Sequence, residues 1–317
     1  MAKAGFAVLL IVMIASVVDA RELRRLLVSA DLVWIGVAFL ALTAQTIFSA
    51  LRWQLTAGRL DHVFGWRFAV REYYLSQVIN QTLPGGMLGD AGRAMRCRGA
   101  AGLGKATMAV ALDRLAGQMA LVGVLVAGLG VTLLAPGGFA PPVWIATTVA
   151  VICGGLLAAM IVVRVAGWLP GIAGRGADAL LRGARAGLFN RSVLVRQVVL
   201  SVATAATTLI AFDASARAVG AVLPVGAVLV LVPLVLFAML VPLTISGWGL
   251  REGTAAALLP LAGLTSAKAV AASVIFGLTF LAAVLPGLWP LLTPSLSPPI
   301  HTRTRWGPAE NSPPRDD

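Results

Sequence analysis

Long apolar runs follow one another along almost the whole chain, and the connections between them are short. An α-helix needs about 20 apolar residues to cross the hydrocarbon layer of a bilayer, and these runs lack the strict alternation of a membrane β-barrel. The first run is not followed by a good signal-peptidase site, so we expect it to remain as a helix. The pattern predicts spanning helices near residues 4–18, 32–51, 106–134, 143–163, 197–219 and 267–291.

Two further apolar segments, residues 68–84 and 225–262, are interrupted by proline and glycine. Proline removes a backbone donor and breaks a helix, whereas glycine lets the chain turn sharply. Together with the runs above, these segments predict an all-α fold, a polytopic transmembrane helical bundle of about eight membrane segments. We expect residues 1–292 to form this membrane domain, and the proline- and charge-rich residues 293–317 to be a disordered cytoplasmic tail.

Composition supports a membrane protein, because 59% of the residues are hydrophobic and only 12% are charged, against about 25% charged residues in a typical soluble domain. The net charge of +12 lies in the connections, which favours contact with anionic lipid headgroups over nucleic acid. Two cysteines and two histidines give no support for a disulfide framework, a metal site or a histidine-dependent hydrolase. We therefore expect neither a metal nor a cofactor.

Charge in the connections predicts the orientation. The connection 135–142 is uncharged, whereas 164–196 carries six arginines. Positive residues favour the cytoplasmic side, so we expect the second connection inside, the first outside, and a multi-pass protein of the cell (inner) membrane. Two interpretations of 164–196 stay open: an amphipathic helix with Leu180, Leu181 and Leu188 facing lipid, or a solvated loop. The arginine-rich first connection fits this topology poorly.

The two interrupted segments share a pattern of proline, four residues, glycine, three residues and arginine. The matched positions lie a constant 158 residues apart: Pro84 and Pro242, Gly89 and Gly247, Arg93 and Arg251. Paired interrupted segments in corresponding halves of a membrane protein indicate an inverted repeat with a transport site between its halves. The charged flanks of the first segment, which begin at Arg52, predict that it enters from the cytoplasm. The short connections beside the second segment look external, so we expect that segment to enter from outside. Coincidence, in a chain rich in glycine and alanine, is the alternative.

Charged residues lie at both breaks and inside one apolar run. A charge at the centre of a membrane helix costs about 2.5–3.5 kcal/mol on insertion scales, so such groups pair, face water or bind a ligand. We interpret the arginines as ligands of a phosphate, which guanidinium groups hold bidentately, with the acids positioning them; internal salt bridges or interfacial charges are the other interpretation. The candidate substrate-binding residues are Asn80, Pro84, Gly85, Gly86, Gly89, Asp90, Arg93, Asp113, Arg114, Pro242, Gly247, Gly249, Arg251 and Glu252.

The same residues, in this order, resemble the transmembrane region of bacterial lysylphosphatidylglycerol synthases, over residues 5–292. That family includes flippase-like proteins connected with hopanoid, cardiolipin and glycolipid metabolism, so the resemblance implies a domain that translocates lipids. The full synthases carry a soluble aminoacyl-transferase domain after the membrane part. The sequence after residue 292 does not resemble it, so we do not expect lysyl transfer.

We expect a lipid flippase or transporter rather than an enzyme, working by alternating access on a lipid that carries a phosphate. The candidates are an aminoacyl-phospholipid, another anionic phospholipid and a polyprenyl-phosphate-linked glycolipid. One alternative is a membrane-embedded polyprenyl-phosphate glycosyltransferase, against which the short and nearly uncharged external connections count. The other is a non-transporting partner of a lipid-modifying enzyme, against which the paired arginine motifs count.

Overall fold

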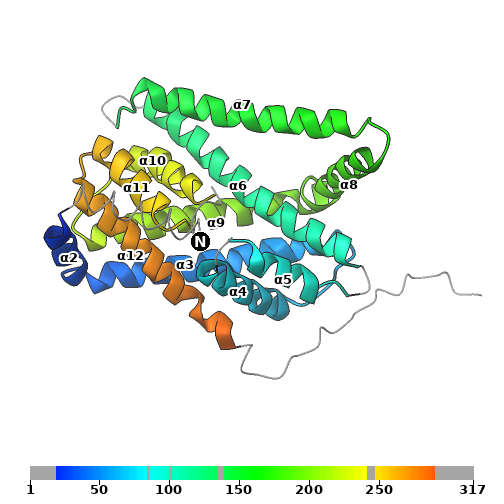
Figure 1. The fold of residues 1–317 in the computed structure, drawn as a ribbon, viewed down its shortest axis with the longest axis horizontal. Helices are drawn as coiled ribbons and strands as arrows, with labels where there is room; N and C mark the ends of the chain where they lie inside the picture. The colour runs from blue at the N-terminus through cyan, green and yellow to red at the C-terminus, as the bar shows by residue number, and fades with distance from the viewer. Residues whose placement is uncertain (1–18, 84–85, 100–101, 135–138, 241–246, 290–317) are drawn as a thin grey trace, which may run out of the picture.

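The structure is a computed structural model of the 317-residue chain, and it describes residues 19–83, 86–99, 102–134, 139–240 and 247–289. Within these ranges the regular structure is helical (Figure 1), which confirms the all-α prediction. The α-helices are α2 (Ala20–Val28), α3 (Leu32–Gly58), α4 (Trp66–Thr82), α5 (Leu88–Arg96), α6 (Leu103–Leu134), α7 (Val143–Ala166), α8 (Ile172–Gly187), α9 (Arg191–Ala218), α10 (Val225–Phe237), α11 (Leu250–Leu258) and α12 (Ser266–Val284). Short 3-10 helices follow three of them, namely η1 (Ala238–Leu240), η2 (Leu259–Ala262) and η3 (Leu285–Leu288).

Five of the described helices are long and apolar enough to cross a membrane: α3, α6, α7, α9 and α12 with η3. Each coincides with one of the predicted runs, so these five predictions are confirmed. Some helices extend beyond the apolar run, because polar residues continue them; α3, for example, reaches Gly58. The run 4–18 and the tail 293–317 lie outside the described residues, and the total of about eight membrane segments stays a prediction.

Helices α3 and α9 pack against each other along the centre of the bundle and run antiparallel (Figure 1). The side chains of Asp31 and Asn190 cap their first turns by accepting backbone N–H bonds of 2.8 and 3.0 Å, which satisfies donors that a helix start leaves free. At one end, the N–H of Asp31 donates to the carbonyl of Ala218 at 2.9 Å. At the other end, Arg59 Nη2 donates to Ser192 Oγ at 2.5 Å.

Each half of the structure contains a long helix, a broken hairpin and a second long helix, in the orders α3, α4–α5, α6 and α9, α10–α11, α12. Each hairpin also packs on a helix of the other half, α4 on η3 and α10 on α6. Glycine permits both contacts. A Cβ at Gly287 would lie 2.5 Å from the carbonyl of Tyr74, and a Cβ at Gly128 would lie 2.5 Å from the Cβ of Leu229. The two halves are therefore interlocked.

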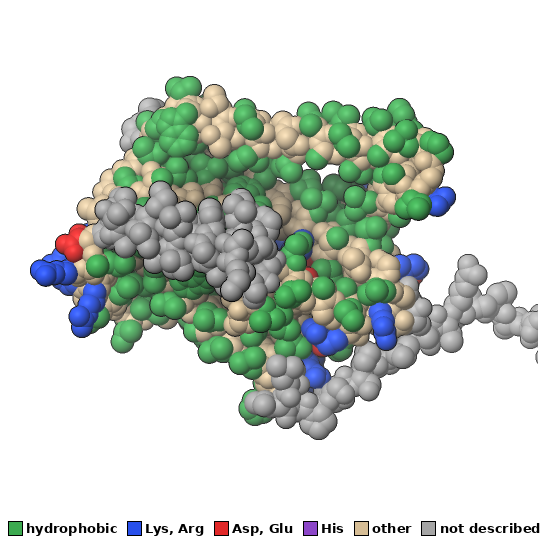
Figure 2. All heavy atoms as spheres, in the orientation of Figure 1, with side chains coloured by type: hydrophobic (Ala, Val, Ile, Leu, Met, Phe, Trp, Pro, Cys, Tyr) green, Lys and Arg blue, Asp and Glu red, His purple; other side chains and the backbone are tan. Residues whose placement is uncertain are grey.

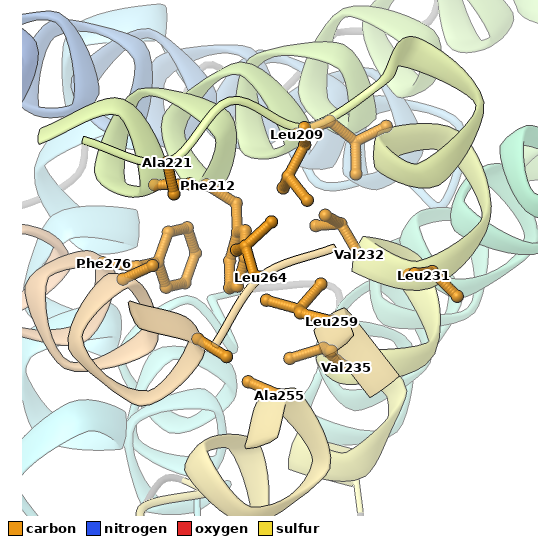
Figure 3. Packing of buried hydrophobic residues seen from close by; sticks show 14 of the residues in the cluster. Leu209, Phe212, Ala221, Leu231, Val232, Val235, Ala255, Leu259, Leu264 and Phe276 are labelled. Atoms are coloured by element: carbon orange, nitrogen blue, oxygen red, sulfur yellow. The ribbon is translucent and has the colours of Figure 1, made fainter. Parts of the chain in front are cut away.

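The larger apolar core lies between α9, α10, α11 and α12 (Figure 3). The rings of Phe212 and Phe276 have centroids 5.4 Å apart, and Val232, Val235 and Leu259 beside them are fully buried. Between membrane helices, such close packing supplies the attraction that exclusion from water supplies in soluble proteins. The second interrupted segment is thus held inside the bundle.

Residues 172–187 form a helix, α8, so the helical interpretation of the connection 164–196 is confirmed. The small side of this helix packs on protein, because Gly183 and Gly187 lie against Met108 of α6 and Thr56 of α3. Leu188 is only 6% exposed, so the prediction that it faces lipid was wrong. The glycines allow the close packing that buries this part of the connection.

Helix α7 lies at the edge of the bundle, along the top of Figure 1, and only Ile145 and Val149 on it are buried. The visible face of the molecule has Lys and Arg side chains mainly at its two ends and hydrophobic side chains between them (Figure 2). That distribution is expected of a bundle that crosses a bilayer. The end where α3 finishes has the greater number of basic residues: Arg59, Arg67, Arg71, Arg96, Arg98, Lys105, Arg164, Arg175, Arg182, Arg185, Arg191 and Arg196.

Candidate functional site

The first interrupted segment is a hairpin: α4 ends at Thr82 and α5 begins at Leu88. Gly86 in the turn has a φ of +62°, a left-handed conformation that glycine adopts without strain. Pro84 and Gly85 lie outside the described residues. The predicted break in the helix is therefore confirmed, because one helix ends before it and another begins after it.

Gly89 brings the two helices of this hairpin into direct contact. A Cβ at this position would lie 2.0 Å from the carbonyl oxygen of Ser76 on α4, so only glycine fits. Its N–H donates to Asn80 Oδ1 at 2.8 Å, which joins the start of α5 to the end of α4. This contact sets the position of the next residue, Asp90.

Asp90 is the centre of a buried polar cluster and is 5% exposed. Its carboxylate oxygens accept hydrogen bonds from Ser76 Oγ at 3.0 Å, Asn80 Nδ2 at 3.2 Å, Arg93 Nη2 at 3.0 Å and Arg114 Nε at 2.7 Å. Charge-assisted bonds of this kind are the strong ones in proteins. Asp90 thereby ties α4, α5 and α6 together at the depth of the break.

Arg93 is fully buried and lies between two aromatic rings. Its guanidinium carbon is 4.4 Å from the ring centroids of both Trp53 and Tyr73, a cation–π arrangement that is strongest where water is excluded. Besides Asp90, Arg93 Nη2 approaches Asp113 Oδ2 at 3.6 Å. Asp113 is held in turn by Arg52 of α3, whose Nε donates to Oδ1 at 2.9 Å.

The charges of this cluster do not cancel. Three guanidinium groups, those of Arg52, Arg93 and Arg114, stand against the two carboxylates of Asp90 and Asp113, which leaves one excess positive charge. Buried charges are costly unless they are paired, so an anion that enters the site would complete the balance.

The second interrupted segment also forms a hairpin, with α10 and η1 ending at Leu240 and α11 starting at Leu250. Gly247 and Gly249 have φ values of +80° and +87°. The N–H of Gly249 donates to Glu252 Oε2 at 2.6 Å, so the Glu252 side chain satisfies a free backbone donor at the start of α11. Pro242 lies outside the described residues.

Arg251 is surrounded much as Arg93 is. It is 1% exposed, donates to Glu252 Oε1 at 2.6 Å and to Ser273 Oγ at 2.9 Å, and lies 5.0 and 5.5 Å from the ring centroids of Trp248 and Phe276. The matched arginines of the two motifs thus share one environment, a carboxylate partner and two aromatic faces.

A cavity of about 250 Å³, with polar side chains in an otherwise largely apolar wall, lies between the two breaks. Helices α3, α4, α6, α9 and α12 and the end of α10 with η1 contribute to its wall. The described polar residues that line it are Gln45, Ser49, Arg52, Tyr73, Gln77, Asn80, Gln81, Arg114, Gln118, Thr204 and Thr208. Polar groups at this depth of an apolar bundle are typical of a water-filled or ligand-filled site.

The structure separates the predicted site residues by their positions. Asn80, Gly86 and Arg114 line the cavity. Asp90, Arg93 and Asp113 lie behind its wall in the first cluster, whereas Arg251 and Glu252 form a separate pair in the second hairpin. Gly89 packs the helices of the first hairpin, and Gly247 and Gly249 shape the turn into α11.

Several lining residues were missed from the sequence. The sequence places Arg52 in the charged flank of the first interrupted segment, because the apolar run before it ends at residue 51. Gln45 and Gln118 lie inside predicted spans, and an amide within an apolar run is the signal that could have identified them.

Together, the long apolar helices, the paired broken hairpins and the buried charges define an integral membrane protein of the polytopic α-helical class. The family model described as "Lysylphosphatidylglycerol synthase TM region" matches residues 1–287. The chain belongs to this family, and the resemblance noted in the sequence is confirmed. A search of curated proteins finds no match.

Proposed function

We propose that this protein moves a phosphate-bearing lipid between the leaflets of the cell (inner) membrane, and that the cavity between the two hairpins receives the headgroup. The observation that carries the proposal is a cavity within an apolar bundle that is lined by two arginines and several amide and hydroxyl side chains, next to a cluster with one excess positive charge. A headgroup crossing the hydrocarbon layer needs such a path, because lipid offers no partners to polar groups.

Arg114 and Arg52 are the residues proposed to contact the phosphate. Both line the cavity, and the Arg114 side chain is 38% exposed, although Asp90 already binds one edge of it. Arg93 and Arg251 instead hold the hairpins in shape, since their guanidinium groups are enclosed by aromatic rings and carboxylates. This division refines the sequence-based hypothesis that all of these arginines bind phosphate.

Alternating access would follow from the arrangement of the two halves. The first hairpin enters the bundle from the end at Arg59 and the second from the end at Ala218, as in an inverted repeat. Motion of one hairpin against the long helices would open the cavity to one leaflet at a time. A transporter of this kind performs no covalent chemistry, and we propose that the chain is not an enzyme.

The test is lipid movement in vesicles containing the purified protein. Fluorescent phosphatidylglycerol is supplied to both leaflets, and dithionite quenching from outside follows the arrival of inner-leaflet lipid. Replacing Arg114 by Gln removes a charge-assisted contact of about 1.5–3 kcal/mol, so the rate should fall about 10- to 100-fold. Arg185→Gln, on the exposed side of α8, is the matched control and should leave the rate unchanged.

Size-exclusion chromatography of both variants verifies folding. An unchanged rate in a folded Arg114→Gln protein contradicts the proposed site. An equal loss in both variants contradicts a specific role for the cavity.

A further inference from the structure

The lining of the cavity is selective in its chemistry. Most of the polar residues that line it carry an amide or a hydroxyl group, and among the described lining residues none is a carboxylate. The charged groups are the guanidinium groups of Arg52 and Arg114. Amides and hydroxyls donate and accept at the same time, which suits hydroxyl groups of a ligand. Behind the wall, Asp113 and Asp90 pair with these two arginines, but Arg93 leaves the cluster with one excess positive charge. This excess suits a phosphate and disfavours an ammonium group.

Two buried atoms of the lining lack a partner. Arg52 Nη1 is a donor without an acceptor, and Gln118 Oε1 is an acceptor without a donor. The two residues line the same cavity, and Gly117, the chain neighbour of Gln118, would place a Cβ only 3.1 Å from Arg52 Nη2. Buried polar atoms are nearly always hydrogen-bonded, and leaving them unpaired destabilises the folded protein. One ligand that presents an anionic oxygen beside a hydroxyl would satisfy both atoms.

We propose that the lipid headgroup is an uncharged polyol joined to the phosphate, and that the cavity discriminates against headgroups carrying a cation. Arg52 Nη1 donates to a phosphate oxygen, and Gln118 Oε1 accepts from a headgroup hydroxyl. An aminoacyl headgroup would place its ammonium group near two guanidinium groups. The inference rests on the proposed function, which assigns the cavity to the lipid headgroup, but binding selectivity can be measured without any movement.

Two sources provide this chemistry, the open-chain glycerol of phosphatidylglycerol and the ring of a lipid whose phosphate carries a cyclic polyol. Phosphatidylinositol is the probe for the second source, and phosphatidic acid supplies a phosphate without a polyol. Lysyl-phosphatidylglycerol is the fourth probe, because it adds a cation to phosphatidylglycerol. Native mass spectrometry of the full chain in detergent, with each lipid titrated, gives the four dissociation constants.

We expect phosphatidylglycerol, phosphatidylinositol or both to bind at least about tenfold more tightly than lysyl-phosphatidylglycerol; which of them binds best identifies the source. Gln118→Leu should weaken polyol binding about tenfold, as expected for one lost hydrogen bond, and leave phosphatidic acid unaffected. Equal affinity for lysyl-phosphatidylglycerol, or an equal loss for phosphatidic acid, would overturn the proposal.

Thr208 and Thr207 provide a matched pair for the same titration. Each donates its hydroxyl to a backbone carbonyl at 2.7 Å, and only Thr208 lines the cavity. Thr208→Val should weaken polyol binding, whereas Thr207→Val should not; equal effects count against the site.

Vesicle assays separate this inference from the proposed function. Polyol selectivity in binding, without lipid movement, supports the inference and refutes transport. Equal movement of phosphatidylglycerol and its lysyl derivative supports transport and refutes the selectivity.

Discussion

Gly89→Ala tests the packing on which the first cluster depends. The new Cβ would lie 2.0 Å from the carbonyl oxygen of Ser76, where ordinary contact begins at 3.4 Å. The obstructing atom belongs to a helix backbone, so α4 and α5 would have to separate by about 1.4 Å, the difference between these two distances. The bond between Gly89 and Asn80, now 2.8 Å, and that between Ser76 and Asp90, now 3.0 Å, would then exceed hydrogen-bonding distance.

The expected loss of stability follows from these contacts. One hydrogen bond between neutral groups and one to a carboxylate, together with overpacking, amount to about 3–7 kcal/mol. Proteins are stable by only about 5–15 kcal/mol. Thermal unfolding in detergent, followed by tryptophan fluorescence, should therefore show a Tm at least about 6 °C lower.

The matched control is Gly253→Ala in α11, the corresponding short helix of the second hairpin. A Cβ there meets nothing within 4 Å, so the Tm should stay constant or rise slightly, because alanine is the better helix former. A Gly89→Ala protein with the Tm of the unmodified protein would refute the account of the hairpin contact.

Arg251→Met should destabilise the protein by about 3–5 kcal/mol, because it leaves Glu252 buried without its cation; adding Glu252→Gln should restore part of the lost Tm. Cysteines introduced at Ala140 and Arg185, in a background without other cysteines, should react with impermeant maleimides from opposite sides of the membrane. His62 is buried, and burial lowers its pKa below the usual 6.5. As the pH falls, this histidine binds a proton in the unfolded protein before it does so in the folded one. The Tm should therefore be constant above pH 6.5 and decrease below it. The decrease should be smaller in His62→Leu.

A specific outcome would contradict each of these three predictions. If the double variant is no more stable than Arg251→Met, the ion pair is not what holds the second hairpin. Labelling of both cysteines from one side would overturn the predicted topology. A Tm with the same acid dependence in the unmodified protein and in His62→Leu would assign that dependence to other groups.

The hydrophobic pattern predicted the spans well, because a helix that crosses a bilayer must be apolar along its own length. The breaks at the two hairpins were predictable for a similar reason, since proline and glycine act on the local backbone. Both the confirmed spans and the confirmed breaks thus depend on short stretches of sequence. The ends of the helices, such as Gly58, were less predictable because polar residues continue them.

The partners of the site residues could not be read from the sequence. Asp113 pairs with Arg52, 61 positions away, and Arg93 lies between Trp53 and Tyr73 on two other helices. These contacts depend on how α3, α4 and α6 pack. The cavity depends on packing too, so the role proposed for Gln118 follows only from its position in the cavity wall.

The interlocking of the halves through Gly128 and Gly287 has a consequence for biosynthesis. Helix α4 receives its partner η3 from the last helical turn that the structure describes, so the first hairpin has an uncovered side while most of the chain is still being made. The residues of the first cluster all lie on α3, α4, α5 and α6, but insertion of these helices alone leaves the η3-facing side of α4 without its protein partner. The final arrangement has to wait until α12 enters the membrane, and a fragment that stops at α6 should not reach the native state.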